Sequence, residues 1–320
     1  MPGDNRAAPA GSAGPSDAPS SIQRSIPTPK EFDFRTTVRS HGWCRLAPFG
    51  WDEETSRLSR PLRVPGGVSR IDFDQPRGAG GSLGATVTGG RGGRDGLDDY
   101  RWRAVEHHAT RIFQLDRDLA EFVRLAHGAG DSFATAAGRG FGRLLRTPTL
   151  FEDVVKILAT TNTTWGGTVA MARNLVRLTG AQAFPTPVEV AGLGADRLAK
   201  EGRWGYRAPY LAGLAEAVAD GTLDLDRWEN WDGTTAELEA EVRKVPGLGP
   251  YATAHVLMLL GRFDRIGIDT AFRSFVRQKY FPRARKPVSD ARMLAVYDSW
   301  GEWRGLAYWA DLWLWHTDTA

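Results

Sequence analysis

Apolar and polar residues alternate along much of the stretch from residue 32 to residue 90, which is the pattern of short, half-buried strands. The alternation is clearest in Phe32-Asp33-Phe34-Arg35 and in Val68-Ser69-Arg70-Ile71-Asp72-Phe73, and segments with Pro and Gly lie between such stretches. We therefore expect a small antiparallel sheet. The glycine-rich stretch 78–93 lacks the spacing of a phosphate-binding loop, so we expect a flexible hairpin loop there.

Beyond about residue 113 the apolar positions recur at helical spacing. They form three sets: Leu115, Leu119, Phe122 and Leu125; Phe151, Val154, Val155 and Leu158; and Leu211, Leu214 and Val218. Residues 1–30 have no apolar period and are rich in Pro, Ala, Gly and Ser, so we expect a disordered tail. The sequence thus predicts an α+β fold that is mostly α, with an antiparallel β domain at 31–112 packed on an all-helical domain at 113–320.

The composition narrows the class of protein only a little. The net charge is +3 and the sequence pI is about 9.1, which is compatible with a polyanionic partner. A single cysteine, Cys44, excludes an intrachain disulfide framework and a four-cysteine iron–sulfur cluster, and it is either a packing residue or a reactive thiol. Neither a membrane-spanning run nor a secretion signal is visible, so we expect a cytoplasmic, nucleoid-associated protein with no membrane contact.

The residues 235–261 have the local signals of two short helices joined by a tight turn. Thr234-Thr235-Ala236-Glu237 is a capping box, which starts the first helix. Pro246-Gly247 ends it, Gly249 allows a close backbone approach, and Pro250 suits the first position of the second helix. A plain αα-hairpin is the alternative, but two glycines beside a helix N-terminus favour a phosphate-binding role.

A carboxylate follows the second helix in Gly267-Ile268-Asp269-Thr270. Five segments are together similar to the helix–hairpin–helix DNA glycosylase superfamily. They are the hairpin, this segment, Gly205-Tyr206-Arg207-Ala208-Pro209-Tyr210, Thr161-Asn162-Thr163-Thr164 and Ile112-Phe113-Gln114-Leu115-Asp116. The resemblance runs from about residue 32 to the C-terminus. It is stronger for the 8-oxoguanine branch and looser for the 3-methyladenine branch, and it implies a β domain packed on a helical glycosylase domain.

The resemblance implies the catalytic residues. Asp269 would stabilise the positive charge that develops on the sugar and orient a water, and it could also cap the helix that starts at Thr270. Strand-cutting relatives have a lysine nucleophile at the position of Tyr251, and tyrosine is a poor imine former. The resemblance therefore implies a glycosylase without lyase activity. The lysines of the sequence are Lys30, Lys156, Lys200, Lys244, Lys279 and Lys286.

The resemblance also implies the DNA contacts. The DNA backbone would be held by Gly247, Gly249, Ala252 and Arg273. Many relatives have a polar, phosphate-contacting side chain at the position of Ala271, and Arg273 would compensate for its absence. Tyr206 looks like the wedge that replaces the flipped base, and Arg207 and Asn162 look like the residues that read the orphaned partner base. The alternatives are that Tyr206 is a core aromatic and that Asn162 is an ordinary loop residue. The base pocket would include Trp165, Arg304 and Tyr308, although helix packing accounts for most of the C-terminal aromatics.

These expectations define one leading function and two rivals. The leading function is a monomeric, monofunctional glycosylase that flips out and excises an oxidised or alkylated purine from duplex DNA in base-excision repair. The rivals are a non-catalytic damage-binding protein and a glycosylase/lyase with a lysine from elsewhere. No cofactor is required and no iron–sulfur cluster is expected, but the resemblance implies Na⁺ or K⁺ on the carbonyls of Arg243, Val245 and Leu248.

Overall fold

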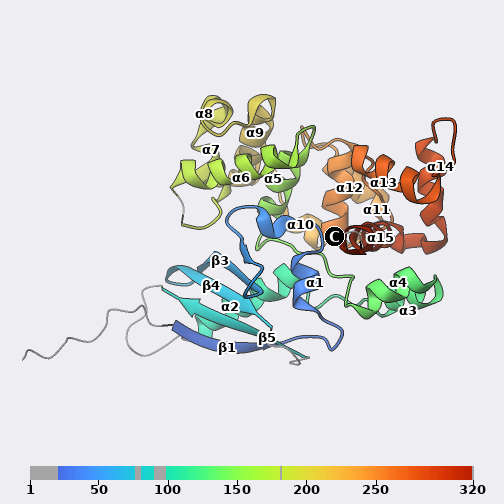
Figure 1. Ribbon diagram of the computed structural model, residues 1–320. Coiled ribbons are helices and arrows are strands. Elements are labelled where there is room, and N and C mark those ends of the chain that lie inside the picture. Colours follow the sequence, from blue (N-terminus) through green and yellow to red (C-terminus); the bar gives the residue numbers. More distant parts are fainter. Residues whose placement is uncertain (1–20, 76–80, 90–98, 181, 319–320) are drawn as a thin grey trace, which may run out of the picture.

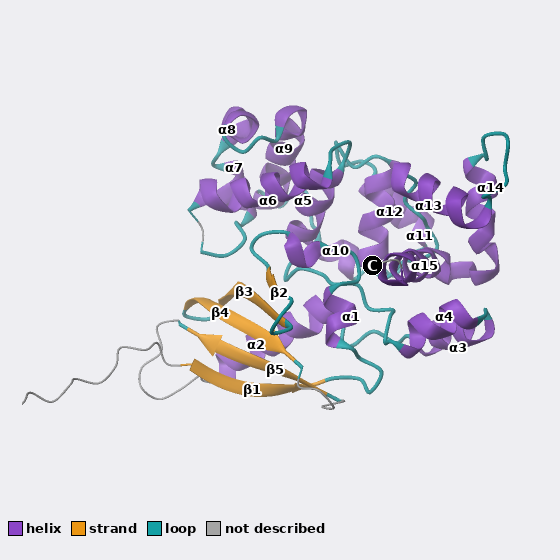
Figure 2. Cartoon of the chain, viewed as in Figure 1, coloured by secondary structure: helices purple, strands orange, loops and turns teal. Residues whose placement is uncertain are grey.

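A five-stranded antiparallel sheet forms the N-terminal part of the molecule (Figure 1). The computed structural model describes residues 21–75, 81–89, 99–180 and 182–318. The strands lie in the order β1-β5-β4-β3-β2, and their bounds are Ser21–Pro27 (β1), Gly50–Asp52 (β2), Arg57–Val64 (β3), Gly67–Asp74 (β4) and Ser82–Thr88 (β5). The long helix α2 (Asp99–Phe113) packs against β3, and a short helix α1 (Phe34–Val38) lies between the sheet and the helical part (Figure 2).

Three sequence predictions about this region were wrong. The expected tail includes β1, which pairs with β5 along its whole length; residues 1–20 lie outside the described residues. The glycine-rich stretch contains β5, whose Leu83, Ala85 and Val87 alternate into the core, while 76–80 and 90–98 are not described. The expected strand at Phe34 is a helix, because the Asp33 carboxylate accepts the Thr36 N–H at 2.7 Å and caps it.

Helices make up the rest of the chain, so the predicted α+β, mostly α fold class is confirmed. The predicted amphipathic segments around Phe151 and Leu211 are α5 and α9, and the predicted hairpin is α11 and α12. The helices that follow α2 are α3 (Ala120–Gly128), α4 (Asp131–Gly138), α5 (Leu150–Thr160), α6 (Trp165–Thr179), α7 (Pro187–Ala191), α8 (Gly194–Lys200), η2 (Gly205–Arg207), α9 (Ala208–Ala219), α10 (Asp226–Glu229), α11 (Thr235–Val242), α12 (Pro250–Leu259), α13 (Thr270–Tyr280), α14 (Asp290–Leu294), η3 (Ala295–Trp303) and α15 (Arg304–Asp318).

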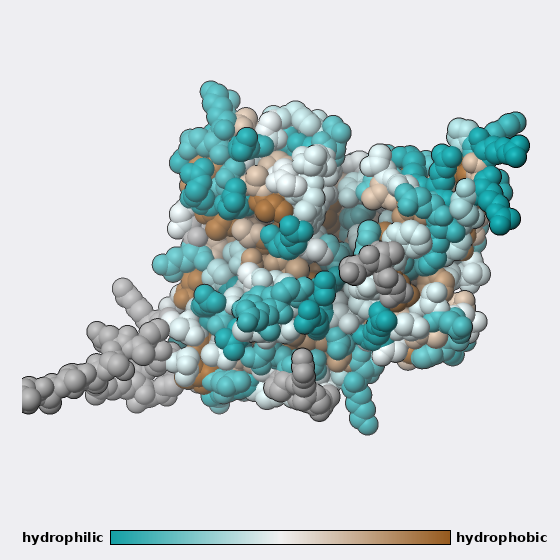
Figure 3. Space-filling model, in the orientation of Figure 1, coloured by the Kyte–Doolittle hydropathy of each residue, from teal (hydrophilic) through white to brown (hydrophobic). Residues whose placement is uncertain are grey.

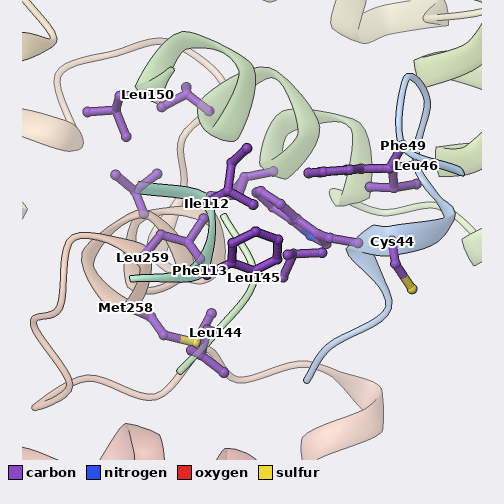
Figure 4. Close-up of a cluster of buried hydrophobic side chains, with 14 of the residues drawn as sticks. Cys44, Leu46, Phe49, Ile112, Phe113, Leu144, Leu145, Leu150, Met258 and Leu259 are labelled. Carbon is purple, nitrogen blue, oxygen red and sulfur yellow. The ribbon is translucent and has the colours of Figure 1, made fainter. Parts of the chain in front are cut away.

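A single hydrophobic core joins the sheet to the helices. Phe113, at the end of α2, has its ring 5.1 Å from that of Phe73 on β4 and 5.5 Å from that of Phe34 on α1. Figure 4 shows the same core continuing through Leu145 toward Cys44 and the helical part. Burial raises the pKa of Cys44 to about 11, which favours its role as a packing residue.

Buried charges add to this junction. Asp153 on α5 is fully buried, and its carboxylate accepts hydrogen bonds from Arg111 of α2 at 3.0 Å and from Arg146 at 3.1 Å. The Thr147 N–H and hydroxyl also donate hydrogen bonds to this carboxylate. One carboxylate therefore holds α2, the segment before α5 and α5 itself together.

The surface in Figure 3 is mostly hydrophilic, and hydrophobic residues appear on this face only in small separate patches. Within the described ranges, no helix combines the length and the apolar character that a membrane span requires.

Replacement of Asp153 by Asn should lower the free energy of unfolding by about 3 kcal/mol, because Arg111 and Arg146 lose their fully buried counter-charge and keep only the more exposed Glu229. Chemical denaturation followed by circular dichroism measures it. Asp232→Asn, at an exposed position, is the matched control and should change stability by less than about 0.5 kcal/mol. Equal stability of the two variants would contradict the structural role of Asp153.

Candidate active site

Asp269 is held at the start of α13 by a cap. Its Oδ1 accepts the Phe272 N–H at 2.7 Å, and its extended backbone turns the chain from the preceding loop into the helix. No hydrogen bond to Oδ2 is present among the described residues. The capping role and a chemical role are therefore compatible, since each uses a different oxygen.

A cavity of about 480 Å³ opens beside Asp269. It brings together seven of the residues singled out from the sequence, which come from the α5–α6 loop, η2, the hairpin and the start of α13. Its lining is Thr160, Thr161, Asn162, Thr163, Tyr206, Tyr210, Gly247, Gly249, Pro250, Tyr251, Ala252, Ile268, Asp269 and Thr270. We refer to it as the catalytic cleft.

The two hairpin glycines differ in what they require. Gly247 has a φ of +89°, and a Cβ there would lie 2.9 Å from Leu158 Cδ1 and 3.0 Å from the Tyr210 ring. Gly249 has an ordinary φ of −69° and open space around it. Close packing therefore demands Gly247, whereas Gly249 leaves room beside the first amides of α12.

Tyr251 forms the floor of the cleft from the first turn of α12. Burial raises the pKa of its hydroxyl; a hydrogen bond with Thr160 opposes the shift, and the nearby charge of Asp269 adds to it. The phenol therefore stays protonated at neutral pH. One turn further on, the His255 ring packs against that of Tyr251, with the ring centroids 4.2 Å apart and the planes tilted by 43°.

A run of rings leads from the catalytic cleft to a second cavity, of about 750 Å³. The Trp309 ring of α15 lies 6.0 Å from that of His255 and 6.0 Å from that of His41. His41 and Trp309 line the second cavity, together with Gly42 and Trp313. The sequence analysis missed His41 and His255, for which the one-turn spacing of His255 from Tyr251 was the only signal. Trp309 is one of the C-terminal aromatics that suit either base stacking or helix packing.

Both histidines are neutral. Burial lowers the pKa of His41 to about 4, and burial also lowers the pKa of His255. His41 Nε2 lies 2.8 Å from the Leu145 carbonyl oxygen, and His255 Nδ1 lies 2.8 Å from that of Tyr251. Because a carbonyl only accepts, these nitrogens carry the protons, and the other nitrogen of each ring is an acceptor.

Tyr206, Arg207 and Asn162 form one cluster at the cleft. Tyr206 is 55% exposed and lines the cleft, so it is not a core aromatic. Arg207 is only 6% exposed and donates to the carbonyl oxygens of Thr161 and Asn162. Asn162 is exposed and has a left-handed backbone, with a φ of +43°.

The remaining candidate residues do not line the cleft. Trp165 is partly exposed at the start of α6, and Arg273 forms an ion pair with Asp290 at 2.8 Å. Arg304 donates to the Leu294 carbonyl at the end of α14 and pairs with Asp298 of η3.

Tyr308 is buried behind the cleft, with its ring 5.2 Å from that of Phe272 on α13. Burial raises the pKa of Tyr308, and the charge of Asp269 adds to this, so the hydroxyl stays neutral. This side chain supports the helix that begins at Asp269.

This chain is similar to known proteins in structure but matches none in sequence. No family model matches the chain, and no curated protein matches its sequence. Among solved structures, the Clostridium acetobutylicum 8-oxoguanine glycosylase/lyase in complex with DNA has a TM-score of 0.67 at 15% identity, covering 93% of this chain and 99% of its own. The Archaeoglobus fulgidus 3-methyladenine DNA glycosylase has a TM-score of 0.68 at 16% identity, with 91% and 98% covered.

The chain has the fold of the helix–hairpin–helix DNA glycosylases. A protein named MBOgg1, solved with a low-affinity DNA ligand, is similar too, with a TM-score of 0.68 at 20% identity over 93% of this chain and 96% of its own. In this glycosylase fold, the expected pairing of a hairpin with a following aspartate is present in three dimensions, because both line one cavity.

The two hairpin glycines predict different effects on stability. Gly247→Ala should lower the free energy of unfolding by about 1–2 kcal/mol, because the new Cβ meets Leu158 and Tyr210 at a left-handed backbone. Gly249→Ala should change it by less than about 0.5 kcal/mol. Denaturant titration of both variants checks this, and a Gly249 variant as unstable as the Gly247 variant would show that the hairpin is packed differently.

Proposed function

We propose that this protein is a monofunctional DNA glycosylase, which flips a damaged purine out of duplex DNA and hydrolyses its bond to deoxyribose. The observation that carries the proposal is the catalytic cleft, where Asp269, the hairpin glycines and the exposed Tyr206 share one cavity. The damaged base is an oxidised or alkylated purine, since the similar structures include glycosylases named for 8-oxoguanine and for 3-methyladenine.

The hairpin holds the DNA backbone beside the cleft. Gly249 precedes α12 and presents no side chain, so a phosphate can approach the first amides of the helix, at Tyr251 and Ala252. The partial positive charge of a helix N-terminus favours that anion. Such contacts fix the register of the duplex without reading its sequence. Arg273 would join them only by leaving Asp290.

A base inside the duplex cannot reach Asp269, so it must leave the stack. Tyr206 is exposed and lines the cleft, which supports its role as the residue that fills the gap. Asn162 lines the same cavity, and its exposed amide offers both donors and an acceptor to the orphaned base. The flipped base would pass Tyr251 toward the rings of His255 and Trp309 and the second cavity, where stacking holds it.

Loss of the base builds positive charge on the sugar, and a carboxylate close to the anomeric carbon stabilises that charge. Asp269 Oδ2 supplies the stabilising negative charge, while Oδ1 keeps accepting the hydrogen bond that caps α13. The same oxygen can orient a water and take its proton as the water attacks the sugar. The product is an abasic site in an unbroken strand.

The lysines of the chain support hydrolysis over strand cutting. None of the six lysines lines the catalytic cleft or the second cavity. Lys244, three positions before Gly247, is exposed and pairs with Glu241 at 2.6 Å. Lys156, four positions before Thr160, is fully buried and pairs with Glu152 at 2.7 Å, and burial lowers its pKa to about 8. An imine would need this side chain to leave the core.

We propose that the hairpin carbonyls hold a monovalent cation. Val245 O and Leu248 O each accept one hydrogen bond, from the Leu248 N–H and the Thr253 hydroxyl, which leaves each a second lone pair. With Arg243 O they form a neutral set of oxygen donors, which suits Na⁺ or K⁺ and supplies no redox or acid chemistry. Bound there, the ion would add positive charge beside the backbone phosphate.

Duplexes that carry single damaged purines test the proposal. Incubation with the protein should release 8-oxoguanine, 3-methyladenine or 7-methylguanine, and strands should break only after alkali. Borohydride should trap no covalent adduct, because no amine is in the cleft.

The rival functions give different products in the same experiment. Strand breaks before alkali, with an adduct that borohydride traps, would establish a lyase. Binding of damaged duplex without release of any base would favour a damage-binding protein and would overturn the proposed catalysis.

A further inference from the structure

The segment from residue 270 to residue 289 holds the excess positive charge of the chain. It contains six of the 41 lysines and arginines and none of the 38 aspartates and glutamates, which leaves 35 basic and 38 acidic residues elsewhere. The segment comprises α13 and the loop that joins it to α14. Because it follows Asp269 directly, the excess charge begins beside the catalytic cleft.

Two of these six cations have partners within the protein, and four do not. Lys279 pairs with buried Asp311, and Arg273 pairs with Asp290 at 2.8 Å. The other four have neither an ion pair nor a side-chain hydrogen bond among the described residues, and all are exposed: Arg277, Arg283, Arg285 and Lys286. We refer to these four side chains as the basic strip. Like charges gathered without counter-charges repel one another, and an anionic partner would relieve that repulsion.

The loop that carries three of these cations is held in a defined shape. Phe281 and Val288, at its two ends, pack against the core. The Ala284 N–H donates to the Phe281 carbonyl oxygen at 3.0 Å, which closes a turn with Pro282 at its second position, where proline is favoured. Figure 1 shows this loop projecting beyond α14 at the upper right, and hydrophilic side chains extend at the same place in Figure 3. The loop thus presents its charges on a short, constrained segment, which reduces the entropy lost on binding.

The strip and the residues proposed to enter the duplex lie on opposite sides of the catalytic cleft. Asn162 follows α5 and Tyr206 precedes α9, and Figure 1 shows α9, α5, α12, α13 and α14 in this order from left to right. Along α13, Arg277 lies eight residues beyond Asp269, which is about 12 Å of helix. About three to four base pairs of B-DNA span the same length. The strip is therefore placed beside the flank of a bound duplex and not beside the lesion.

We propose that the basic strip binds the phosphates of the DNA duplex on one flank of the lesion, several base pairs from Asp269. The inference rests on the proposed function and extends it, since the hairpin holds the backbone at the lesion and the strip holds it further out. Guanidinium and ammonium groups form charge-assisted hydrogen bonds with phosphate oxygens, and such contacts position a duplex whatever its sequence. Continuity of the strip with the catalytic cleft favours DNA over an acidic protein as the partner.

Two triple variants of equal net charge test the proposal. The loop variant removes the exposed charges of the α13–α14 loop and leaves α13 unchanged: Arg283→Gln, Arg285→Gln and Lys286→Gln. The matched control removes three exposed cations of the N-terminal part and α3: Lys30→Gln, Arg103→Gln and Arg124→Gln. Wild type and both variants are titrated, at several salt concentrations, with a duplex of about 25 base pairs that carries a central tetrahydrofuran abasic analogue.

The slope of log Kd against log salt concentration reports how many phosphates the protein neutralises. In the loop variant this slope should fall by about 2 to 3, and binding at about 0.1 M salt should weaken at least tenfold. The control variant should keep the wild-type slope within about 0.5. A loop variant that matches the control in slope, with a Kd within about twofold, would overturn the proposal and would make an acidic protein the better candidate partner.

Neutral methylphosphonate linkages locate the contact on the DNA. Blocks of three are placed about three to six linkages from the lesion, on each strand and each flank in turn. One block should weaken wild-type binding about tenfold but binding by the loop variant less than about twofold, because the charge pair is already broken there. If every block weakens the two proteins equally, the strip does not contact the backbone and the proposal is wrong.

The same titrations separate this inference from the proposed function. A wild type that binds damaged and intact duplex equally and releases no purine would overturn the proposed function. Salt slopes on intact duplex test the strip even then, because phosphate contacts do not need a flipped base. A lower slope in the loop variant than in the control would uphold the strip, and equal slopes would overturn it.

Discussion

The hydrogen bond from the Phe272 N–H to Asp269 Oδ1 is the contact on which the site depends. It begins α13 and commits one carboxylate oxygen to structure, which directs the other toward the cleft. The helix is fixed at its far end as well. Buried Asp311 of α15 accepts the hydroxyls of Tyr280, at the end of α13, and of Tyr297 at 2.6 and 2.8 Å. The position of the carboxylate is therefore set by the packing of two helices and not by the loop before it.

The site combines rigid parts from distant segments, and each supplies one element of the proposed chemistry. The hairpin gives exposed amides, η2 gives an exposed tyrosine, and α13 gives the carboxylate. The rings of Tyr251, His255 and Trp309 join this cleft to the second cavity, and the neutral His41 lies at the far end of the run. Because burial keeps both imidazoles uncharged, this run of rings offers aromatic faces and hydrogen-bond acceptors, and the positive charge at the second cavity comes from Arg35, Arg39 and Arg139.

Features with a local cause could be predicted from the sequence, and those that depend on distant contacts could not. The capping box at Thr234, the two glycines and Pro250 act within a few residues, and the hairpin was predicted correctly. The strand Ser82–Thr88 was missed because its stability comes from pairing with β1 and β4 on both sides, which no local pattern shows. The direction of the Arg207 side chain and the approach of His41 to Trp309 also depend on segments far apart in the sequence.

The central claim is that Asp269 supplies a charge that the reaction needs, beyond its cap. Replacement by Asn tests this most directly, because the amide oxygen can still cap α13 while the negative charge is lost. Single-turnover release of a damaged purine should fall at least about 100-fold, with thermal stability and Kd for an abasic duplex unchanged within about twofold. Release by Asp269→Asn at the wild-type rate would contradict the account.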